Sequence, residues 1–278
     1  MLKQRVITAI VLLAVLLPAL FYKTPLPFCA VALVLIGAGA WEWGRLNGGN
    51  PVTCLACGAV CVLLCGVSWM AGWLGRPLPF LWALVGAGWV LGGAYLLSHG
   101  VPGWTRISRF WRLPCGVLAL WAAWLAVSQA RFIGVEFLLS ILLLVWVADI
   151  GAYFAGRKFG GRFSRHKLAA SISPGKSWEG VWGGMLGVVL MASVWVTFQP
   201  DGQTVFHRLL GQHGGWIMVL ALVFLVAMSV VGDLVESLVK RSAGAKDSSG
   251  LLPGHGGVLD RVDALLPALP LAMMLVSL

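Results

Sequence analysis

Long apolar runs follow one another along most of the chain. Each run is about 17 residues or longer, which is enough for a helix to cross the ~30 Å hydrocarbon core of a bilayer. The runs lie near residues 6–22, 26–46, 52–74, 80–98, 113–131, 136–156, 178–198, 215–238 and 262–278. Because lipid offers no partners to backbone N–H and C=O groups, and because barrel-type alternation is absent, each run is expected to be a helix. The sequence therefore predicts an all-α, polytopic integral membrane bundle of about nine transmembrane helices.

Composition favours a single membrane domain. Hydrophobic residues make up 59% of the 278 residues and charged residues only 11%, against about 25% charged residues in soluble domains. No appended soluble domain stands out, so residues 1–278 are expected to form one unit. Its first four spans lie within residues 1–112. Its later spans lie within residues 113–278 and carry two long loops, 157–177 and 239–261.

Basic residues predict the orientation of this bundle. With nine spans, only Lys23, Arg76, Arg131 and Arg208 fall on one side, and the other sixteen of the 20 Lys and Arg residues share the side of the N-terminus. Loops rich in Lys and Arg stay in the cytoplasm. We therefore expect the N-terminus in the cytoplasm and the C-terminus on the opposite face. The first run is expected to stay as a span, because no small-residue cleavage site follows it.

Two other readings of the composition are disfavoured. The net charge of +10 could indicate nucleic acid, but no soluble basic module exists, and basic loops also orient membrane proteins and attract anionic headgroups. Four cysteines, Cys54, Cys57, Cys61 and Cys65, could suggest metal ligands. They lie inside an apolar run at helical spacing without a nearby His or acid, so they are expected to be small buried hydrophobic residues.

Acidic residues are few, and most of them fall on one side of the predicted membrane. Glu136 and Asp201 lie on the outer side. The other eight fall in or beside the cytoplasmic half: Glu42, Asp149, Glu179, Asp233, Glu236, Asp247, Asp260 and Asp263. An ionisable group within a span is costly, so each is a candidate for function. The alternative is a structural ion pair with Arg or Lys.

The first long loop is basic and rich in glycine. It ends in Ser173-Pro174-Gly175-Lys176-Ser177-Trp178-Glu179. Gly175-Lys176-Ser177 is similar to the end of a phosphate-binding P-loop, but position 170 is Ala and no strand precedes it, which excludes that motif. What remains is either a basic loop at a helix start, where free N–H groups favour anions, or a topology signal.

The second long loop lies between two groups of acids. Asp233, Glu236 and Ser237 precede it at i, i+3 and i+4, and therefore share one helix face. Asp260 and Asp263 follow it, again three residues apart. Mg²⁺ commonly binds one or two carboxylates together with substrate phosphates, so these acids suit a magnesium site. The alternative is that Asp260 and Asp263 only complement a helix N-terminus.

The same loop offers positive charge and exposed backbone. Lys240, Arg241, Lys246 and Arg261 could neutralise a polyphosphate, and His255-Gly256-Gly257 provides a ring and accessible N–H groups. His255 could equally be a simple turn residue. The combination indicates a site for a phosphorylated substrate more strongly than any of its parts.

The stretch 237–263 resembles the signature of phosphatidate cytidylyltransferases. It shows Lys240-Arg241, Lys246-Asp247, His255-Gly256-Gly257 and Asp260-Arg261-Val262-Asp263 in the family's order, without departure. Three further stretches are similar to the family in the same order: 42–46, 149–157 and 173–180. Ser177 stands where many relatives carry Thr, a change that keeps the hydroxyl.

This resemblance implies a Mg²⁺-dependent reaction of CTP with phosphatidic acid that yields CDP-diacylglycerol and pyrophosphate. A second cation would be compatible with it. The implied partners are CTP, phosphatidic acid and membrane lipids, with no nucleic acid, and the family suggests a homodimer. The implied location is a bacterial cytoplasmic (inner) membrane, with the active site facing the cytoplasm.

The residues expected to perform this chemistry fall into two groups. Catalytic roles are expected for Asp149, Lys176, Asp233, Asp260 and Asp263, among which Asp233, Asp260 and Asp263 would bind the metal. Substrate binding is expected for Ser173, Ser177, Glu179, Ser237, Lys240, Arg241, Lys246, Asp247, His255, Gly256, Gly257 and Arg261. Two rival functions stay open: a CTP-dependent lipid kinase of the polyprenol or phytol type, which would release CDP, and a transporter with an ion path through the acids.

Overall fold

The structure, a computed structural model, describes residues 2–164 and 167–278. These residues form helices and contain no β-strand, only an isolated bridge between Leu252 and Gly256. The helices, with one 3₁₀ turn η1, are α1 (Leu2–Phe21), α2 (Leu26–Leu46), α3 (Pro51–Met70), η1 (Trp73–Gly75), α4 (Pro79–Arg106), α5 (Arg109–Ile133), α6 (Val135–Phe159), α7 (Trp178–Phe198), α8 (Val205–His213), α9 (Gly215–Ser242), α10 (Leu259–Val262) and α11 (Leu265–Leu275).

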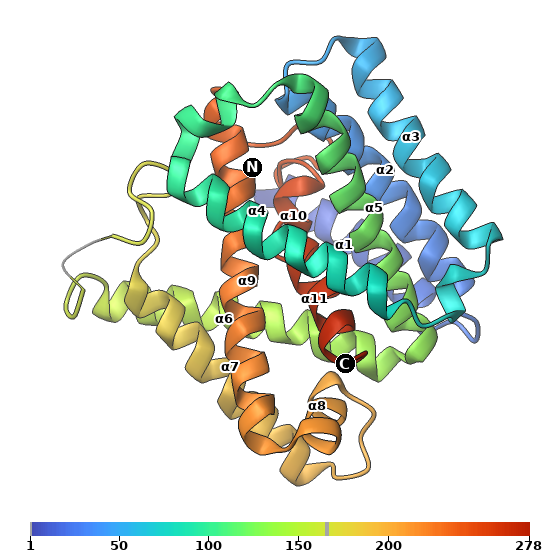
Figure 1. Cartoon of the computed structure of the whole chain (residues 1–278), viewed down its shortest axis with the longest axis vertical. Coiled ribbons are helices and arrows are strands. Elements are labelled where there is room, and N and C mark those ends of the chain that lie inside the picture. Colours follow the sequence, from blue (N-terminus) through green and yellow to red (C-terminus); the bar gives the residue numbers. More distant parts are fainter. Residues whose placement is uncertain (1, 165–166) are drawn as a thin grey trace.

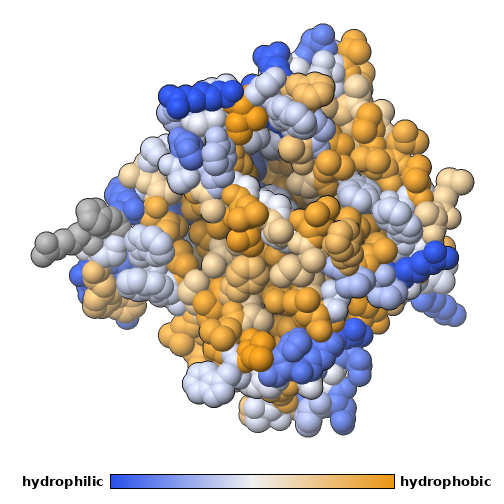
Figure 2. All heavy atoms as spheres, viewed as in Figure 1, coloured by the Kyte–Doolittle hydropathy of each residue, from blue (hydrophilic) through white to orange (hydrophobic). Residues whose placement is uncertain are grey.

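Eight helices of the described chain, α1 to α7 and α9, are long and apolar enough to cross a membrane. Figure 2 shows the corresponding surface, with hydrophobic residues across the middle of the molecule and hydrophilic residues gathered toward its edges. The all-α, polytopic membrane fold is therefore confirmed. Cys54, Cys57, Cys61 and Cys65 are buried along α3 and form no disulfide, as expected of small packing residues.

The expected ninth span, residues 262–278, is not one long helix. α11 has 11 residues, which at 1.5 Å per residue is roughly half of the hydrocarbon thickness. It follows α10 through Asp263 and Ala264, whose backbone angles are still helical. Pro267 has no N–H to donate to the carbonyl of Asp263, and its ring crowds that carbonyl. This proline explains why the helix is interrupted beside the acidic pair.

The interrupted helix lies at the centre of the bundle. Figure 1 shows α11 enclosed by other helices, and it packs against α4, α5, α6 and α9. A glycine on α9 permits this close approach, because a Cβ at Gly232 would clash with the carbonyl of Asp263. The chain thereby holds the acids of α9 next to Asp260 and Asp263.

The second long loop and the C-terminus lie at opposite ends of the bundle. Thr8 Oγ1, near the start of α1, donates a hydrogen bond to the carbonyl of Pro253 in the second loop (2.9 Å). At the other end, Gln212 Nε2 on α8 donates to the carbonyl of Val276 (3.3 Å). Figure 1 shows α8 and the C-terminus together at the lower end, away from α10. Neither α8 nor η1 was among the helices predicted from the sequence.

Candidate active site

One face of α9 carries the first group of acids, as the spacing predicted. Ser237 Oγ donates a hydrogen bond to Asp233 Oδ1 one turn earlier (3.3 Å). Lys240 Nζ lies 2.6 Å from Glu236 Oε2, also one turn apart. The helix therefore presents two acid-containing pairs to the same side.

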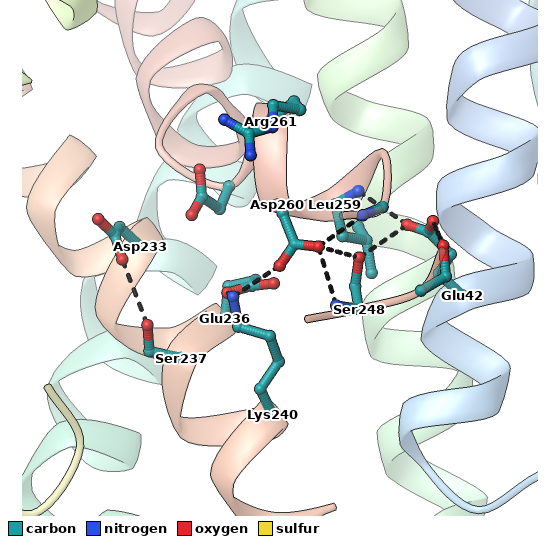
Figure 3. Close-up of polar contacts among 12 residues, drawn as sticks. Glu42, Asp233, Glu236, Ser237, Lys240, Ser248, Leu259, Asp260 and Arg261 are labelled. Carbon is teal, nitrogen blue, oxygen red and sulfur yellow. Dashed lines mark hydrogen bonds and ion pairs between the residues drawn. The ribbon is translucent and has the colours of Figure 1, made fainter. Parts of the chain in front are cut away.

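Asp260, on α10, faces this side of α9 and organises the second loop. Its Oδ1 lies 2.7 Å from Lys240 Nζ. Its Oδ2 accepts hydrogen bonds from Ser248 N (2.8 Å), Ser248 Oγ (2.8 Å) and Gly257 N (2.7 Å), as Figure 3 shows for Lys240 and Ser248. Burial alone would raise the pKa of Asp260, but Lys240 and the loop donors lower the pKa to about 2. Asp260 is thus a charged carboxylate that closes the loop on itself.

Glu42 of α2 holds the other side of the same loop and was absent from the expected site residues. It is fully buried, with 0% exposure. Its Oε1 accepts from Val258 N (2.9 Å) and Ser249 Oγ, and its Oε2 accepts from Leu259 N (2.8 Å) and Ser248 Oγ (3.1 Å). Figure 3 places Glu42 across Ser248 from Asp260. A carboxylate that receives the first N–H groups of α10 satisfies donors that a helix start leaves open.

Arg45, one turn after Glu42, adds to this attachment. Its guanidinium donates through both Nε (3.1 Å) and Nη2 to the carbonyl of Ser248. The sequence did contain a signal for both residues, since Glu42 was one of few acids within a span and Arg45 belonged to a family-like stretch. What it could not show was that α2 approaches a loop some 200 residues later.

The side chains packed around the second loop leave room only for glycine at two of its positions. Gly256 has a φ of +83°, which L side chains rarely adopt, and a Cβ there would lie 2.7 Å from Asp260 Oδ2. A Cβ at Gly257 would clash with Ser248 Oγ and Glu42 Oε1. These glycines therefore shape the loop, and the Gly257 N–H is used by Asp260 within the protein.

Gly257→Ala is expected to lower kcat/KM about tenfold, because an overpacked site costs about 1–3 kcal/mol and the added methyl must push Ser248 or Glu42 aside. Gly250→Ala is a matched control in the same loop, since a Cβ there meets no heavy atom within 4 Å. Steady-state kinetics and thermal unfolding of both variants would test this. Equal activity of the two variants would contradict the described packing.

The first loop reaches the same site through a lysine. Lys176 Nζ lies 2.6 Å from Asp233 Oδ2, so residues far apart in sequence meet at α9. Ser177 and Glu179 have contacts that shape this loop. Ser177 Oγ accepts from Gly180 N (3.2 Å) at the start of α7, and Glu179 Oε1 accepts from the N–H groups of residues 163 (3.1 Å) and 164 (2.8 Å). Arg165, counted among the cytoplasmic basic residues, lies outside the described residues.

Acidic side chains outnumber basic side chains at the centre of the site. Asp149 and Asp263 each lie within electrostatic range of Asp233. Burial and repulsion from Asp233 raise the pKa of Asp263 above its ordinary value. With Glu236 and Asp260, five carboxyl groups lie around the ammonium groups of Lys176 and Lys240, and a bound cation would favour the charged form of each carboxyl group. The described residues contain no group of three or more His, Cys, Asp or Glu side chains already close enough to hold a metal ion.

The remaining expected residues border this centre. Arg241, Lys246, Asp247 and Arg261 are exposed, and Ser173 and His255 are half-buried. Arg261 Nε donates to the carbonyl of His255 (3.0 Å), which helps to fold the loop, and Arg241 Nε lies 3.5 Å from the carbonyl of Ile172 in the first loop. The structure thus brings both loops and the acidic residues together at one end of the bundle, next to exposed basic side chains.

Comparison with known proteins identifies relatives along almost the whole chain. The chain is 38% identical to the phosphatidate cytidylyltransferase of Pseudomonas aeruginosa, over 97% of this chain and 95% of that protein. It is 35% identical to the phosphatidate cytidylyltransferase of Haemophilus influenzae, over 97% of this chain and 96% of that protein. The model of the cytidylyltransferase family matches residues 3–278, which include both loops and every acid of the site. On this match and these identities, the chain belongs to the cytidylyltransferase family.

Proposed function

We propose that this protein transfers the cytidylyl group of CTP to phosphatidic acid, yielding CDP-diacylglycerol and pyrophosphate. The observation that carries the proposal is the meeting of both loops and five carboxylates at one end of a membrane bundle, in a chain that matches relatives of this name along 97% of its length. A lipid substrate and a polar nucleotide can meet only at such an interface. The lipid kinase and the transporter gain no support from these relatives.

The excess of carboxylates is the reason to propose a magnesium ion at this site. Asp233, Asp260 and Asp263 are the proposed ligands, with Asp149 nearby. Mg²⁺ would neutralise the phosphates of CTP and favour attack at the α-phosphorus. Lys176 and Lys240 now contact Asp233 and Asp260 respectively. We propose that both lysines contact substrate phosphates when CTP is bound, which would free the carboxylates.

The protein's own contribution to the reaction is mainly to position the reactants and balance charge. A phosphate oxygen of phosphatidic acid forms the new bond to the α-phosphorus, and the bond to the bridging oxygen breaks as pyrophosphate leaves. Phosphate monoesters carry a second pKa near 6, so the attacking group is largely a dianion at neutral pH and no general base is required. Lys246, Arg241 and Arg261, exposed beside the acidic centre, are proposed to bind the CTP phosphates.

The proposed reaction is tested by pyrophosphate release from the purified protein. We expect release only when CTP, phosphatidic acid and Mg²⁺ are all present. Phosphatidic acid replaced by diacylglycerol of the same chains is the control, because it lacks the attacking phosphate. Release of CDP in place of pyrophosphate would contradict cytidylyl transfer.

The proposed location is a bacterial cytoplasmic membrane, with the catalytic loops in the cytoplasm. A homodimer stays a prediction. Support for the orientation comes from the excess of Lys and Arg on the side of the N-terminus and from the C-terminus lying at the end opposite the catalytic loops.

For this orientation, a cytoplasm-active reporter fused to the N-terminus is expected to be active, and the same reporter fused after Leu278 is expected to be silent. An alkaline phosphatase fusion at the C-terminus should show the reverse. A C-terminus found in the cytoplasm would contradict the proposed orientation.

A further inference from the structure

A pocket lies at the end of the bundle opposite the catalytic loops. It has a volume of about 390 Å³ and is lined by η1 and the turn after it, the start of α4, the end of α5, α8, and the end of α11 with the residues that follow it. Its lining includes Arg76, Trp82, Gln129, Phe132 and Arg208. Nothing in the proposed reaction uses this pocket.

Hydrogen bonds hold the walls of the pocket in place. Gln129, only 3% exposed, donates through Nε2 to the carbonyls of Trp73 (2.7 Å) and Arg76 (2.8 Å). Its Oε1 accepts from Trp82 Nε1 (3.1 Å). The bond from Gln212 to the carbonyl of Val276 fixes the opposite wall. The pocket is therefore preformed, which lowers the cost of binding a ligand.

Both charged side chains in the lining of the pocket are basic. Arg76 and Arg208 both line it, and no lining residue is an acid. Within the described parts of the chain, neither arginine forms an ion pair, although the Arg208 guanidinium lies 5.0 Å from the centre of the Phe137 ring. This arrangement suits an anion, and phosphate is an oxyanion that guanidinium groups recognise well.

Basic residues are scarce on the side of the membrane opposite the N-terminus, so the presence of two of them in one pocket is informative. Only Lys23, Arg76, Arg131 and Arg208 were assigned to that side, because such residues are depleted outside the cytoplasm. Arg131 is buried and donates to the carbonyls of Leu20 (2.9 Å) and Tyr22 (2.7 Å). Two of the remaining three line one pocket. The positive-inside rule does not explain why Arg76 and Arg208 lie here, because that rule disfavours basic residues on the side opposite the cytoplasm.

The surroundings of the pocket indicate that its ligand is a lipid. Phe132, in the lining, is 39% exposed, and Phe80, directly after the lining residue Pro79, is 82% exposed. Apolar side chains exposed beside a cationic pocket suit acyl chains attached to a phosphate headgroup. We propose that this pocket binds the phosphate-bearing headgroup of an anionic membrane lipid in the leaflet opposite the catalytic loops, with Arg76 and Arg208 as its charge partners.

The test is the binding of a short-chain phosphatidylglycerol to the purified full-length protein in neutral detergent, followed by native mass spectrometry. Basic residues near the catalytic loops also attract this lipid. The quantity compared is therefore the amount of bound phosphatidylglycerol in each variant relative to the wild type. The double variant Arg76→Gln/Arg208→Gln is compared with Lys23→Gln, which removes a positive charge on the same side outside the pocket. Phosphatidylcholine of equal chain length tests the dependence on net charge, and inorganic phosphate is added as a competitor.

We expect the double variant to lose one bound phosphatidylglycerol, or to bind it at least about tenfold more weakly, while the wild type and Lys23→Gln bind alike. The three proteins should bind phosphatidylcholine alike. Their pyrophosphate release should also be unchanged, which would show that each protein is folded. Equal phosphatidylglycerol binding by all three would overturn the proposal. Displacement of the lipid by millimolar inorganic phosphate would overturn the assignment to a lipid in favour of a free anion.

Discussion

Asp233→Asn is expected to lower kcat about 100-fold or more, which corresponds to roughly 3 kcal/mol of barrier. The substitution keeps the shape of the side chain and removes the charge that faces Lys176 and the proposed metal ion. Because the charge of the α-phosphate changes most in the transition state, the loss should fall on kcat more than on KM. Extra Mg²⁺ should restore little, since the geometry is lost together with the affinity.

Steady-state kinetics with CTP and Mg²⁺ titrated separately would measure this effect. Asp201→Asn is a matched control, because Asp201 is exposed at the end of the bundle opposite the catalytic loops. Lys246→Ala is a useful contrast, since an exposed phosphate contact binds substrate in the ground state too and its loss should mainly raise KM for CTP. A near-normal kcat for Asp233→Asn with only a raised KM would remove Asp233 from the proposed metal site.

Asp260→Asn should reduce kcat to a similar degree, but the two variants should differ in stability. Asp233 has Lys176 and Ser237 as partners, whereas Asp260 accepts three hydrogen bonds that close the second loop. All three of these bonds go to Oδ2, so Asn can keep them only by turning its amide NH₂ toward the ammonium of Lys240, where two donors would face each other. We therefore expect only Asp260→Asn to lower the thermal stability of the loop, which hydrogen exchange of residues 248–257 would report.

Glu42→Gln is expected to lower kcat about 50-fold, although Glu42 is not among the proposed ligands of either substrate. Each Glu42 oxygen accepts from one backbone N–H, that of Val258 or that of Leu259. The Gln amide nitrogen can donate to a serine hydroxyl, but it cannot accept from a backbone N–H. One buried N–H at the start of α10 is then left unpaired, at a cost of about 2–3 kcal/mol. The loop should shift and misplace Asp260.

Glu136→Gln is the matched control for this prediction, because it is the same substitution at the opposite end, where Glu136 Oε2 accepts from Gln203 N (3.0 Å). The measurement is kcat and KM for CTP at saturating phosphatidic acid, with Glu42→Asp as a second variant. Asp keeps the charge, but its shorter side chain cannot reach both N–H groups, so its activity should lie between wild type and Glu42→Gln. Full activity of Glu42→Gln would contradict the positioning role of Glu42.

Much of the fold could be predicted because the sequence of each helix carries a local pattern of apolar and polar residues. Apolar runs predicted the membrane helices, and the spacing of Asp233, Glu236 and Ser237 predicted the face of α9 that carries the acids. The last span could not be delimited in this way, since its apolar composition continues through the break. Pro267 marked the interruption, but prolines also occur within intact membrane helices, as Pro114 does within α5.

The site was less predictable because it depends on contacts between distant segments. The signature named the residues of the second loop but not their partners. Ser177, Glu179 and Gly257 carried the expectation of substrate contact, and the structure shows each of them with a partner inside the protein. Glu42 is the reverse case, because no local pattern reveals that a helix near the N-terminus closes a loop near residue 250. Only the folded chain brings them together.

The central claim, that the α-phosphorus of CTP passes to phosphatidic acid, is tested most directly by following the label of two CTP samples. One sample carries ³²P at the α-position and the other at the γ-position, and each is incubated with the purified protein, Mg²⁺ and phosphatidic acid before the lipid is extracted. Cytidylyl transfer predicts that the α-label enters the lipid and the γ-label leaves as water-soluble pyrophosphate. Recovery of the γ-label in the lipid, with the α-label left in soluble CDP, would contradict this account and assign the protein to the lipid kinases.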